Sequence, residues 1–324
     1  MKVDLSSFET WENLNQSVSD ELKASSELQI RCYLGLASGV FEIALGIAQF
    51  YSHKRSVALV TGHSPHLHPI LPYLYKEGYQ VQIAPETFAA KEWVESLAKD
   101  TCFAILCEDH AVSGELYETE EIEKLLNEKR IFCLKVSHHN HLFRQTELLP
   151  YSVRLCSFDP KTAVALIGSK MRAPALIAPF LEWEAPQFLA SLQKAKAESV
   201  EKKELVLNFE KNLPAGFSAF LQTSQRCFDR ALIYSESLAG EALQQFLASS
   251  LKLNLRAPGW ETRLETTHLC RWGGVRNYDE WWKPRPAESI LRGLLILGIE
   301  VLEHPDLRAT LDKALRECQI ADLS

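Results

Sequence analysis

Short apolar runs alternate with amphipathic stretches between residues 30 and 185. Residues 56–63 (SVALVTGH) begin with an apolar, valine-containing run that Gly62 terminates, a pattern that is typical of a buried strand. The stretch that follows has apolar residues at helical spacing and stops at Gly78, a common helix terminator. The same alternation predicts further strands and helices down the chain. We expect strands within 79–85, 102–110, 131–139, 152–158 and 162–168, and helices within 91–100 and 119–130.

This alternation of strands and helices predicts a mostly parallel sheet sandwiched by helices, so the expected fold class is α/β. The pattern changes after Pro186, where residues 188–212 form a charged stretch that predicts one long helix. Helical runs at 242–253, 288–304 and 307–318, with a strand near 230–237, predict a smaller α+β domain. We therefore expect an N-terminal arm (1–29), a large α/β domain (30–185), and a linker helix with a small C-terminal α+β domain (186–324).

Composition and charge narrow the classes of function. The chain has 324 residues, 46% of them hydrophobic and 24% charged, which is an ordinary globular composition. Its net charge is −7, and an acidic chain lacks the basic face that nucleic acids and anionic membranes require. No apolar run reaches the ~18 residues that cross a bilayer, and the N-terminus has no signal-peptide pattern. We expect a cytoplasmic protein that binds neither nucleic acid nor membrane.

The eight cysteines contain no C-x-x-C pair, which agrees with reduced thiols in a cytosolic protein. Four of them lie inside apolar runs, where a thiol behaves as a small hydrophobic group. Those four are Cys102, Cys107, Cys133 and Cys156.

Histidines gather after three of the predicted strands. In an open α/β sheet, ligands bind outside the carboxyl ends of the strands, so these imidazoles are expected at one edge of the sheet, beside Glu108, Asp109 and Ser137. Solvated or capping histidines in polar loops are one interpretation, and a metal site is another, because zinc prefers imidazole ligands. The histidines concerned are His63, His66, His68, His110, His138, His139 and His141.

Several motifs occur in an order that resembles the large domain of fold-type-I pyridoxal-phosphate enzymes, most closely class V aminotransferases and cysteine desulfurases. Residues 36–50 (LASGVFEIALGIAQF) resemble the turn and helix that hold the cofactor phosphate, with Ser38 and Gly39 in the turn. His63, followed by Pro69, resembles the histidine that stacks on the pyridine ring. Residues 107–125, with Gly114 in register, and the strand at 131–139 match the segments that come next in the family.

The resemblance implies a fold, a cofactor and a set of roles. Residues 157–170 resemble the lysine-bearing loop, which makes Lys161 the candidate for the Schiff base with pyridoxal 5'-phosphate. An alternative register would place this lysine at Lys170. His63 would stack on the ring and move protons, and a phosphate would bind at a helix start after Gly39.

The sequence departs from the family pattern at the same site. Phe41 replaces the threonine of the phosphate turn. The acid that faces the pyridine nitrogen falls at Ser137, and a neutral hydroxyl cannot stabilise a pyridinium. The lysine-bearing loop also lacks the glycines that normally follow the lysine.

Family members are commonly dimers, so the resemblance implies a homodimer and an amino-acid substrate. The aromatic segment at 271–286 (RWGGVRNYDEWWKPRP) has the composition of an interface or substrate rim. Arg271 and Arg276 are candidates for binding a substrate carboxylate. Three functions follow: an aminotransferase-like enzyme, a catalytically inactive pseudoenzyme of the same fold, and a metal-dependent enzyme that uses the histidines.

Overall fold

A computed structural model describes residues 29–60, 67, 70–84, 89–109, 116–138, 148–159, 162–168, 170–171, 200–220, 226, 228, 230–252 and 294–321. Two compact units divide these residues, the first up to Met171 and the second from Val200 onward.

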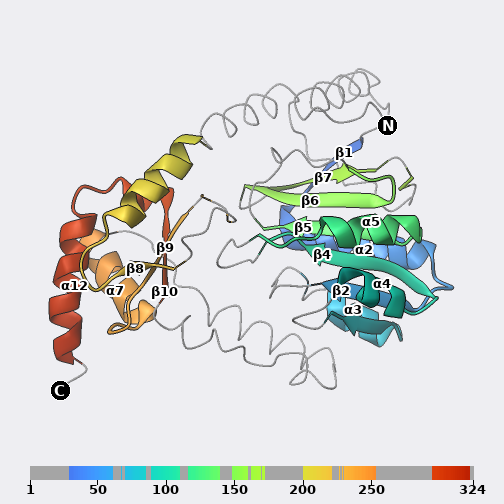
Figure 1. The fold of residues 1–324 in the computed structure, drawn as a ribbon, viewed down its shortest axis with the longest axis horizontal. Helices are drawn as coiled ribbons and strands as arrows, with labels where there is room; N and C mark the ends of the chain where they lie inside the picture. The colour runs from blue at the N-terminus through green and yellow to red at the C-terminus, as the bar shows by residue number, and fades with distance from the viewer. Residues whose placement is uncertain are drawn as a thin grey trace, which may run out of the picture. The chain divides into compact units, whose positions relative to one another are not determined.

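The first unit is built on a sheet of seven strands in the order β1-β7-β6-β5-β4-β2-β3 (Figure 1). Neighbouring strands from β3 to β6 pair in parallel, and β7 is antiparallel to both β6 and β1. Six of the seven strands therefore run in one direction. The strands are β1 (Gln29–Tyr33), β2 (Ser56–Val60), β3 (Gln80–Ile83), β4 (Thr101–Cys107), β5 (Phe132–Ser137), β6 (Ser152–Asp159) and β7 (Thr162–Ile167).

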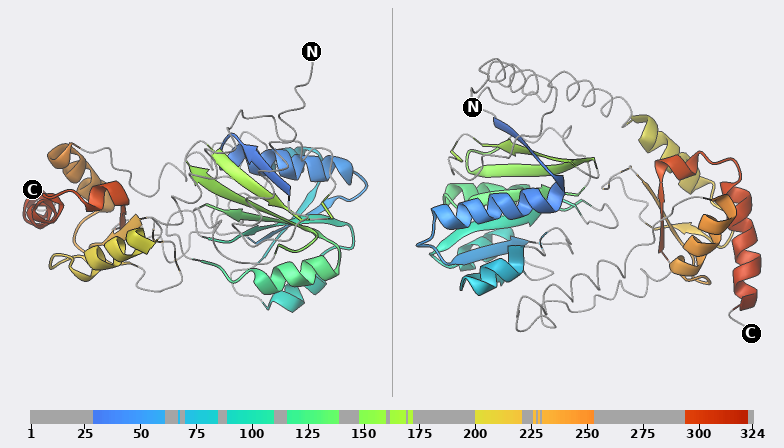
Figure 2. Two further views of the ribbon diagram at one scale, coloured as in Figure 1. Left: turned by 90° about the horizontal axis from the view of Figure 1, so that it is seen from above. Right: turned by 180° about the vertical axis from the view of Figure 1, so that it is seen from behind.

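Helices cover both faces of this sheet (Figure 2). Helix α2 (Gly35–Phe50) and helix α3 (Ile70–Lys76) pack together on one face, while α4 (Ala90–Ser96) and α5 (Glu120–Glu128) pack together on the other. The predicted α/β class with a mostly parallel sheet is confirmed. Gly78 ends the α3 region with a φ of +80°, a conformation that favours glycine.

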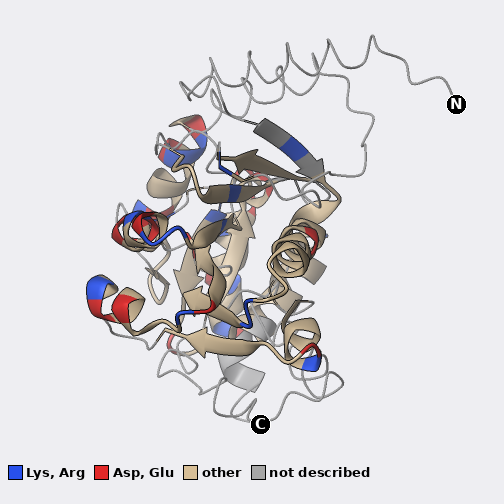
Figure 3. Cartoon of the chain, turned by 90° about the vertical axis from the view of Figure 1, so that its right-hand side faces the viewer, with Lys and Arg blue, Asp and Glu red and all other residues tan. Residues whose placement is uncertain are grey.

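Burial explains why these runs form central strands. All seven residues of β4 are buried, as expected for a parallel strand covered on both faces. Ala104 and Leu106 pack against Trp93, Ile122 and Leu126 of the helices α4 and α5. Lys, Arg, Asp and Glu lie mainly on the helices, and the strands carry few of them (Figure 3).

The four cysteines of the apolar runs are buried thiols of the sheet, as the sequence predicted. All are completely inaccessible, and burial raises the pKa of Cys102 and of Cys156 to about 12. These two thiols therefore stay protonated at neutral pH and act as small apolar groups.

The second unit has a three-stranded antiparallel sheet in the order β10-β9-β8, with its own core. Residues 200–211 are helical, within the stretch predicted as a long helix. Leu243 and Leu247 of α7 and Leu311 of α12 belong to the core. The elements are β8 (Ser218–Ala219), β9 (Arg230–Tyr234), α7 (Gly240–Leu251), β10 (Leu294–Gly298), α11 (Ile299–Leu302) and α12 (Leu307–Ala321).

One helix prediction is wrong in this unit. Residues 288–304 were expected to be a single helix, but Leu294–Gly298 form strand β10, which pairs with β9. A short run of consecutive apolar residues fits a strand as well as a helix, and pairing with β9 decides between them. Only the four residues Ile299–Leu302 within the described part of this stretch are helical.

Within the described parts of the chain, every helix is too short or too polar to cross a membrane.

Candidate functional site

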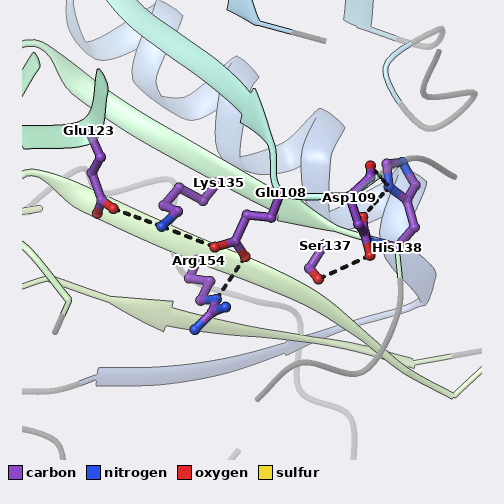
Figure 4. Close-up of polar contacts among 7 residues, drawn as sticks. All are labelled: Glu108, Asp109, Glu123, Lys135, Ser137, His138 and Arg154. Atoms are coloured by element: carbon purple, nitrogen blue, oxygen red, sulfur yellow. Dashed lines mark hydrogen bonds and ion pairs between the residues drawn. The ribbon is translucent and has the colours of Figure 1, made fainter. Parts of the chain in front are cut away.

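The carboxyl ends of β4 and β5 bring a carboxylate, an imidazole and a hydroxyl together (Figure 4). Asp109 lies just after β4, Ser137 is the last residue of β5, and His138 follows it. The side chain of Asp109 is completely buried, and that of His138 is 3% exposed. The sequence predicted polar side chains from these two strands at one edge of the sheet, and this is confirmed for these three residues.

The contacts among the three residues are close and directional. Oδ1 of Asp109 accepts a hydrogen bond from the backbone N–H of His138 at 2.7 Å and lies 2.7 Å from the ring atom Nδ1 of His138. The backbone carbonyl of Asp109 lies 3.1 Å from the same Nδ1. The hydroxyl of Ser137 donates to Oδ2 of Asp109 at 3.4 Å. The carboxylate of Asp109 therefore ties the ends of two neighbouring strands together.

Four buried charged side chains form a second polar group beside this one (Figure 4). The ammonium of Lys135 lies 2.7 Å from Oε2 of Glu123 and 3.0 Å from Oε1 of Glu108. The other oxygen of Glu108 accepts from Nε of Arg154 at 2.8 Å. The two carboxylates balance the two cations, so no net charge is buried by this chain of contacts.

The pKa values of this network follow from its pairing. Burial acts to raise the pKa of Glu108, but Arg154 and Lys135 outweigh it and hold the pKa below its ordinary value. Burial acts to lower the pKa of Lys135, and Glu108 and Glu123 outweigh it and raise the pKa. Both groups are therefore charged at neutral pH, and the network links α5, β5, β6 and Glu108, which directly follows β4.

Helix α2 begins four residues earlier than the expected phosphate turn. The sequence predicted a helix start near Gly39, but α2 starts at Gly35, directly after β1. Gly35 has a φ of +80°, which is the conformation needed to turn from strand to helix. The residue before the helix is Leu34, 64% exposed, and its apolar side chain makes no capping hydrogen bond. The turn that begins the helix (Leu34–Ala37, LGLA) therefore carries no hydroxyl.

The two residues predicted to bind phosphate lie inside α2 and have other partners. Ser38 donates its hydroxyl to Oε1 of Glu42 at 2.8 Å, one helical turn away. Gly39 lets the helix approach β6 closely, because a Cβ atom there would lie 2.9 Å from the side chain of Leu155. Phe41, where the family has threonine, makes an edge contact with Tyr73 of α3 at 6.2 Å between ring centres. These contacts give each residue a packing role.

Replacing Gly39 with valine should lower the free energy of unfolding by about 2 kcal/mol, because overpacking a tight core typically costs 1–3 kcal/mol. The added Cβ alone would lie 3.0 Å or less from both methyl groups of Leu155, which is fully buried, and 3.2 Å from the ring of Tyr33. Urea unfolding followed by circular dichroism measures the loss. Ala242→Val, at an exposed position of α7, is the control and should cost about 0.5 kcal/mol. Equal losses in the two variants would contradict the packing role of Gly39.

The two candidate lysines, Lys161 and Lys170, come before and after β7 in the sequence. Asp159, at the end of β6, pairs with Thr162, at the start of β7, so the sequence leaves two residues between them, Pro160 and Lys161. Both of these lie outside the described residues. Lys170 is exposed, and its backbone N–H bonds to the carbonyl of Pro150, at the amino end of β6. The alternative register is therefore wrong, because Lys170 lies at the opposite edge of the sheet from Ser137.

His63, Arg271 and Arg276 lie outside the described residues, as do the remaining histidines of the strand ends except His138. Among the side chains that the structure does describe, no group of three His, Cys, Asp or Glu has the arrangement of a metal site.

Comparisons with known proteins agree on the fold alone. No protein-family model matches the chain, and no curated protein matches its sequence. A solved structure described as a NifS-like protein superposes with a TM-score of 0.68 at 12% identity, over 99% of this chain and 89% of that one. A NifS-like protein from Rickettsia africae gives 0.63 at 13% identity over 98% and 89% of the two chains. SspA in complex with cysteine gives 0.62 at 12% identity over 92% and 89%. The chain thus has the fold of these proteins, which agrees with the resemblance in its sequence.

Proposed function

We propose that this chain keeps the fold of pyridoxal-phosphate enzymes as a small-molecule-binding protein and does not use the electron-sink chemistry of that cofactor. The observation that carries the proposal is the residue type of Ser137 and its hydrogen bond to Asp109. At the end of β5, where the family pattern requires an acid facing the pyridine nitrogen, the chain has a buried hydroxyl that donates to Asp109. Without a carboxylate facing the ring nitrogen, the ring is a poor electron sink.

The contacts of Asp109 favour a structural role over that of the missing acid. Its carboxylate is completely buried, Oδ1 is bound twice by His138, and Oδ2 accepts from Ser137. A carboxylate that faces a cofactor ring has to present an oxygen to the ring nitrogen. Both oxygens of Asp109 instead accept hydrogen bonds from Ser137 and His138 at the end of β5, which supports a structural role for this carboxylate.

The described start of α2 bears on the phosphate end of the cofactor. The first amides of a helix can bind a phosphate, and α2 offers such amides at its start. Its first turn nevertheless lacks serine and threonine, and the residue before it is an exposed leucine. Ser38, the first serine or threonine of the helix, is bound to Glu42 within the helix. Among the described residues, the end of β5 and the start of α2 therefore lack the acid and the hydroxyl that the family pattern supplies, which supports the proposal.

A pyridoxal-phosphate-dependent, aminotransferase-like enzyme acting on an amino acid is the second candidate. One observation favours it: in the sequence Lys161 is the second residue after β6, and β6 ends at the same edge of the sheet as β4 and β5. A lysine at this edge is what a Schiff base with the cofactor requires.

Stoichiometric pyridoxal phosphate separates the two candidates. We expect the absorbance spectrum of the protein with cofactor to equal the sum of the separate spectra, in the wild type and in Lys161→Ala alike. Borohydride reduction followed by peptide mass spectrometry should then find no single lysine labelled in preference to the others. A new band that disappears in Lys161→Ala and persists in the control Lys170→Ala would refute the proposal and establish the enzyme.

A further inference from the structure

Basic side chains gather at the amino edge of the seven-stranded sheet, opposite the strand ends that hold Asp109 and His138. Strands β2, β3, β4, β5 and β6 begin at this edge, and β7 ends there because it is antiparallel to β6. The basic residues within four positions of these strand ends, here called the basic edge, are Lys54, Arg55, Lys76, Lys99, Lys129, Arg130 and Lys170. The described acidic residues in the same segments are Glu77, Asp100 and Glu128. The local charge is therefore +4 in a chain whose net charge is −7.

The cations of the basic edge face solvent without carboxylate partners. Six of the seven are exposed, and within the part of the chain that the structure describes none of them is in an ion pair. The ammonium groups of Lys54 and Lys129 donate to the backbone carbonyls of Thr101 and Val94, at 3.2 and 2.7 Å. Asp100 accepts hydrogen bonds from a backbone N–H and a hydroxyl at the start of β2. The positive charge is thus left for a partner outside these residues, and it attracts anions to this edge.

Arg130 has a backbone conformation that does not suit arginine. Its φ is +55°, and it directly follows Lys129, the C-cap of α5. Glycine or asparagine usually occupies this left-handed position, because a larger side chain is strained there. The chain therefore keeps an exposed cation at the basic edge at a cost in stability, which is a feature of functional positions.

A row of aromatic rings lies among these cations. The ring of Tyr51 lies 4.8 Å from that of Phe50 and 4.9 Å from that of Phe132, measured between ring centres. Phe132 in turn lies 5.7 Å from Tyr151. The ammonium of Lys54 lies 5.9 Å from the ring centre of Tyr51. Phe50 is 51% exposed, so the row ends in an aromatic ring that is open to solvent beside the positive charges.

We propose that the basic edge binds single-stranded nucleic acid, with its cations contacting phosphates and Phe50 stacking on a base. Proteins that bind single strands without sequence preference combine a positive surface with aromatic side chains on which bases stack. Five of the seven cations are lysines, a residue type that is depleted in protein–protein interfaces, so a protein partner fits less well.

This inference runs against the prediction from net charge that the chain binds no nucleic acid. Net charge averages over the whole surface, whereas a nucleic acid contacts the local field of one face. The inference goes beyond the proposed function and does not depend on it, because the basic edge and the candidate site lie at opposite edges of the sheet.

Fluorescence anisotropy of a dye-labelled oligothymidylate, titrated with the full chain at several salt concentrations, tests the proposal. We expect the logarithm of the affinity to fall with the logarithm of salt concentration by about 0.7 for each phosphate contacted. Lys129→Gln/Arg130→Gln removes two cations of the basic edge and should weaken binding about tenfold or more at roughly 0.1 M salt. Lys91→Gln/Lys124→Gln, which removes two exposed lysines of α4 and α5 outside the basic edge, should keep the wild-type affinity. Absence of binding by the wild type, or equal losses in the two double variants, would overturn the proposal.

Two single variants test stacking and strain separately from charge. Phe50→Ala should weaken binding about 5- to 100-fold, the usual effect of removing an aromatic ring that stacks on a base, with circular dichroism unchanged. Arg130→Gly should weaken binding and yet raise the midpoint of urea unfolding, because glycine adopts the left-handed conformation without strain. An unchanged affinity in Phe50→Ala would refute the stacking role. Binding to duplex DNA, or to vesicles of phosphatidylcholine and phosphatidylserine, as tight as to oligothymidylate would refute a site for single strands.

Discussion

Replacing Gly168 with alanine is expected to lower the free energy of unfolding by about 3 kcal/mol, at the upper end of overpacking costs. Gly168 follows β7, and its N–H donates to the carbonyl of Ser152 at 2.8 Å. A Cβ atom there would lie 2.4 Å from the carbonyl oxygen of Leu149 and 2.8 Å from those of Pro150 and Ser152. All three are backbone atoms, so no side-chain rotation relieves the clash and the segment that begins β6 must move.

Gly78→Ala is the matched control, measured by urea unfolding under the same conditions. Gly78 has a φ of +80°, and nothing lies within 4 Å of the position of its Cβ. Alanine there meets only the backbone cost of the left-handed conformation, roughly 1–2 kcal/mol. If Gly168→Ala were no more destabilising than Gly78→Ala, the result would contradict the claim that three backbone carbonyl oxygens leave no room for a Cβ atom at Gly168.

Replacing Lys135 with methionine should cost about 3–5 kcal/mol, the range for breaking a buried ion pair from one side. Lys135 is 2% exposed, and its loss removes the cation that lies between Glu108 and Glu123. Glu108 keeps Arg154, but no described cation other than Lys135 is paired with Glu123. The variant therefore buries an uncompensated negative charge, and the free energy of unfolding measures its cost.

Two further variants make this result specific. Lys313→Met removes a lysine from an exposed pair with Glu317 and should change stability by less than about 0.5 kcal/mol. The double variant Lys135→Met/Glu123→Leu removes both members of a buried pair, and it should recover about 1–2 kcal/mol relative to Lys135→Met. Equal stability of the single and double variants would contradict the pairing of Lys135 with Glu123.

The cost of Lys135→Met should depend on pH. The pKa of Glu108 is lowered in the folded state, so its contribution is present above its ordinary pKa of 4.5 and is lost as the pH falls. The pKa of Lys135 is raised, so its contribution is present below its ordinary pKa of 10.5 and is lost at higher pH. The difference between wild type and Lys135→Met should therefore be largest near neutral pH and shrink in acid.

The strand order of the first unit explains why some predictions about the site are confirmed. In the sequence, apolar runs followed by polar residues predict where β4 and β5 end, so Asp109, Ser137 and His138 could be expected at one edge of the sheet. The contact between Asp109 and His138 depends on β4 and β5 being neighbours in register, which two runs some 25 residues apart do not reveal. The same register places Lys135 beside Arg154 and within reach of Glu108.

Sequence signals for the charged network existed but were ambiguous. A lysine inside the apolar run 131–139 and an arginine inside 152–158 must each find a carboxylate if those strands are buried. Which acid pairs with each cation depends on the packing of α5 against the sheet, because Glu123 reaches Lys135 from that helix. The local sequence pattern does not determine the distance between Glu123 and Lys135.

The residues that match the phosphate turn of the family lie inside helix α2 and not at its start. Ser38 and Gly39 fit the family pattern by residue type, but the helix starts just after β1, at Gly35. Strand β1 was not expected from the sequence, and its pairing with β7 sets the point at which the chain turns into α2. The match in residue type thus falls one helical turn inside the helix.

By itself, the sequence determined the α/β class, most elements of the large domain and the strand ends where polar groups collect. These follow from local periodicity and turn residues, which act within about ten residues of chain. Only the tertiary structure decided that β10 is a strand, that α2 begins at Gly35, and that Asp109 binds His138. Each of these depends on a partner strand distant in sequence, whose position is fixed when the sheet assembles.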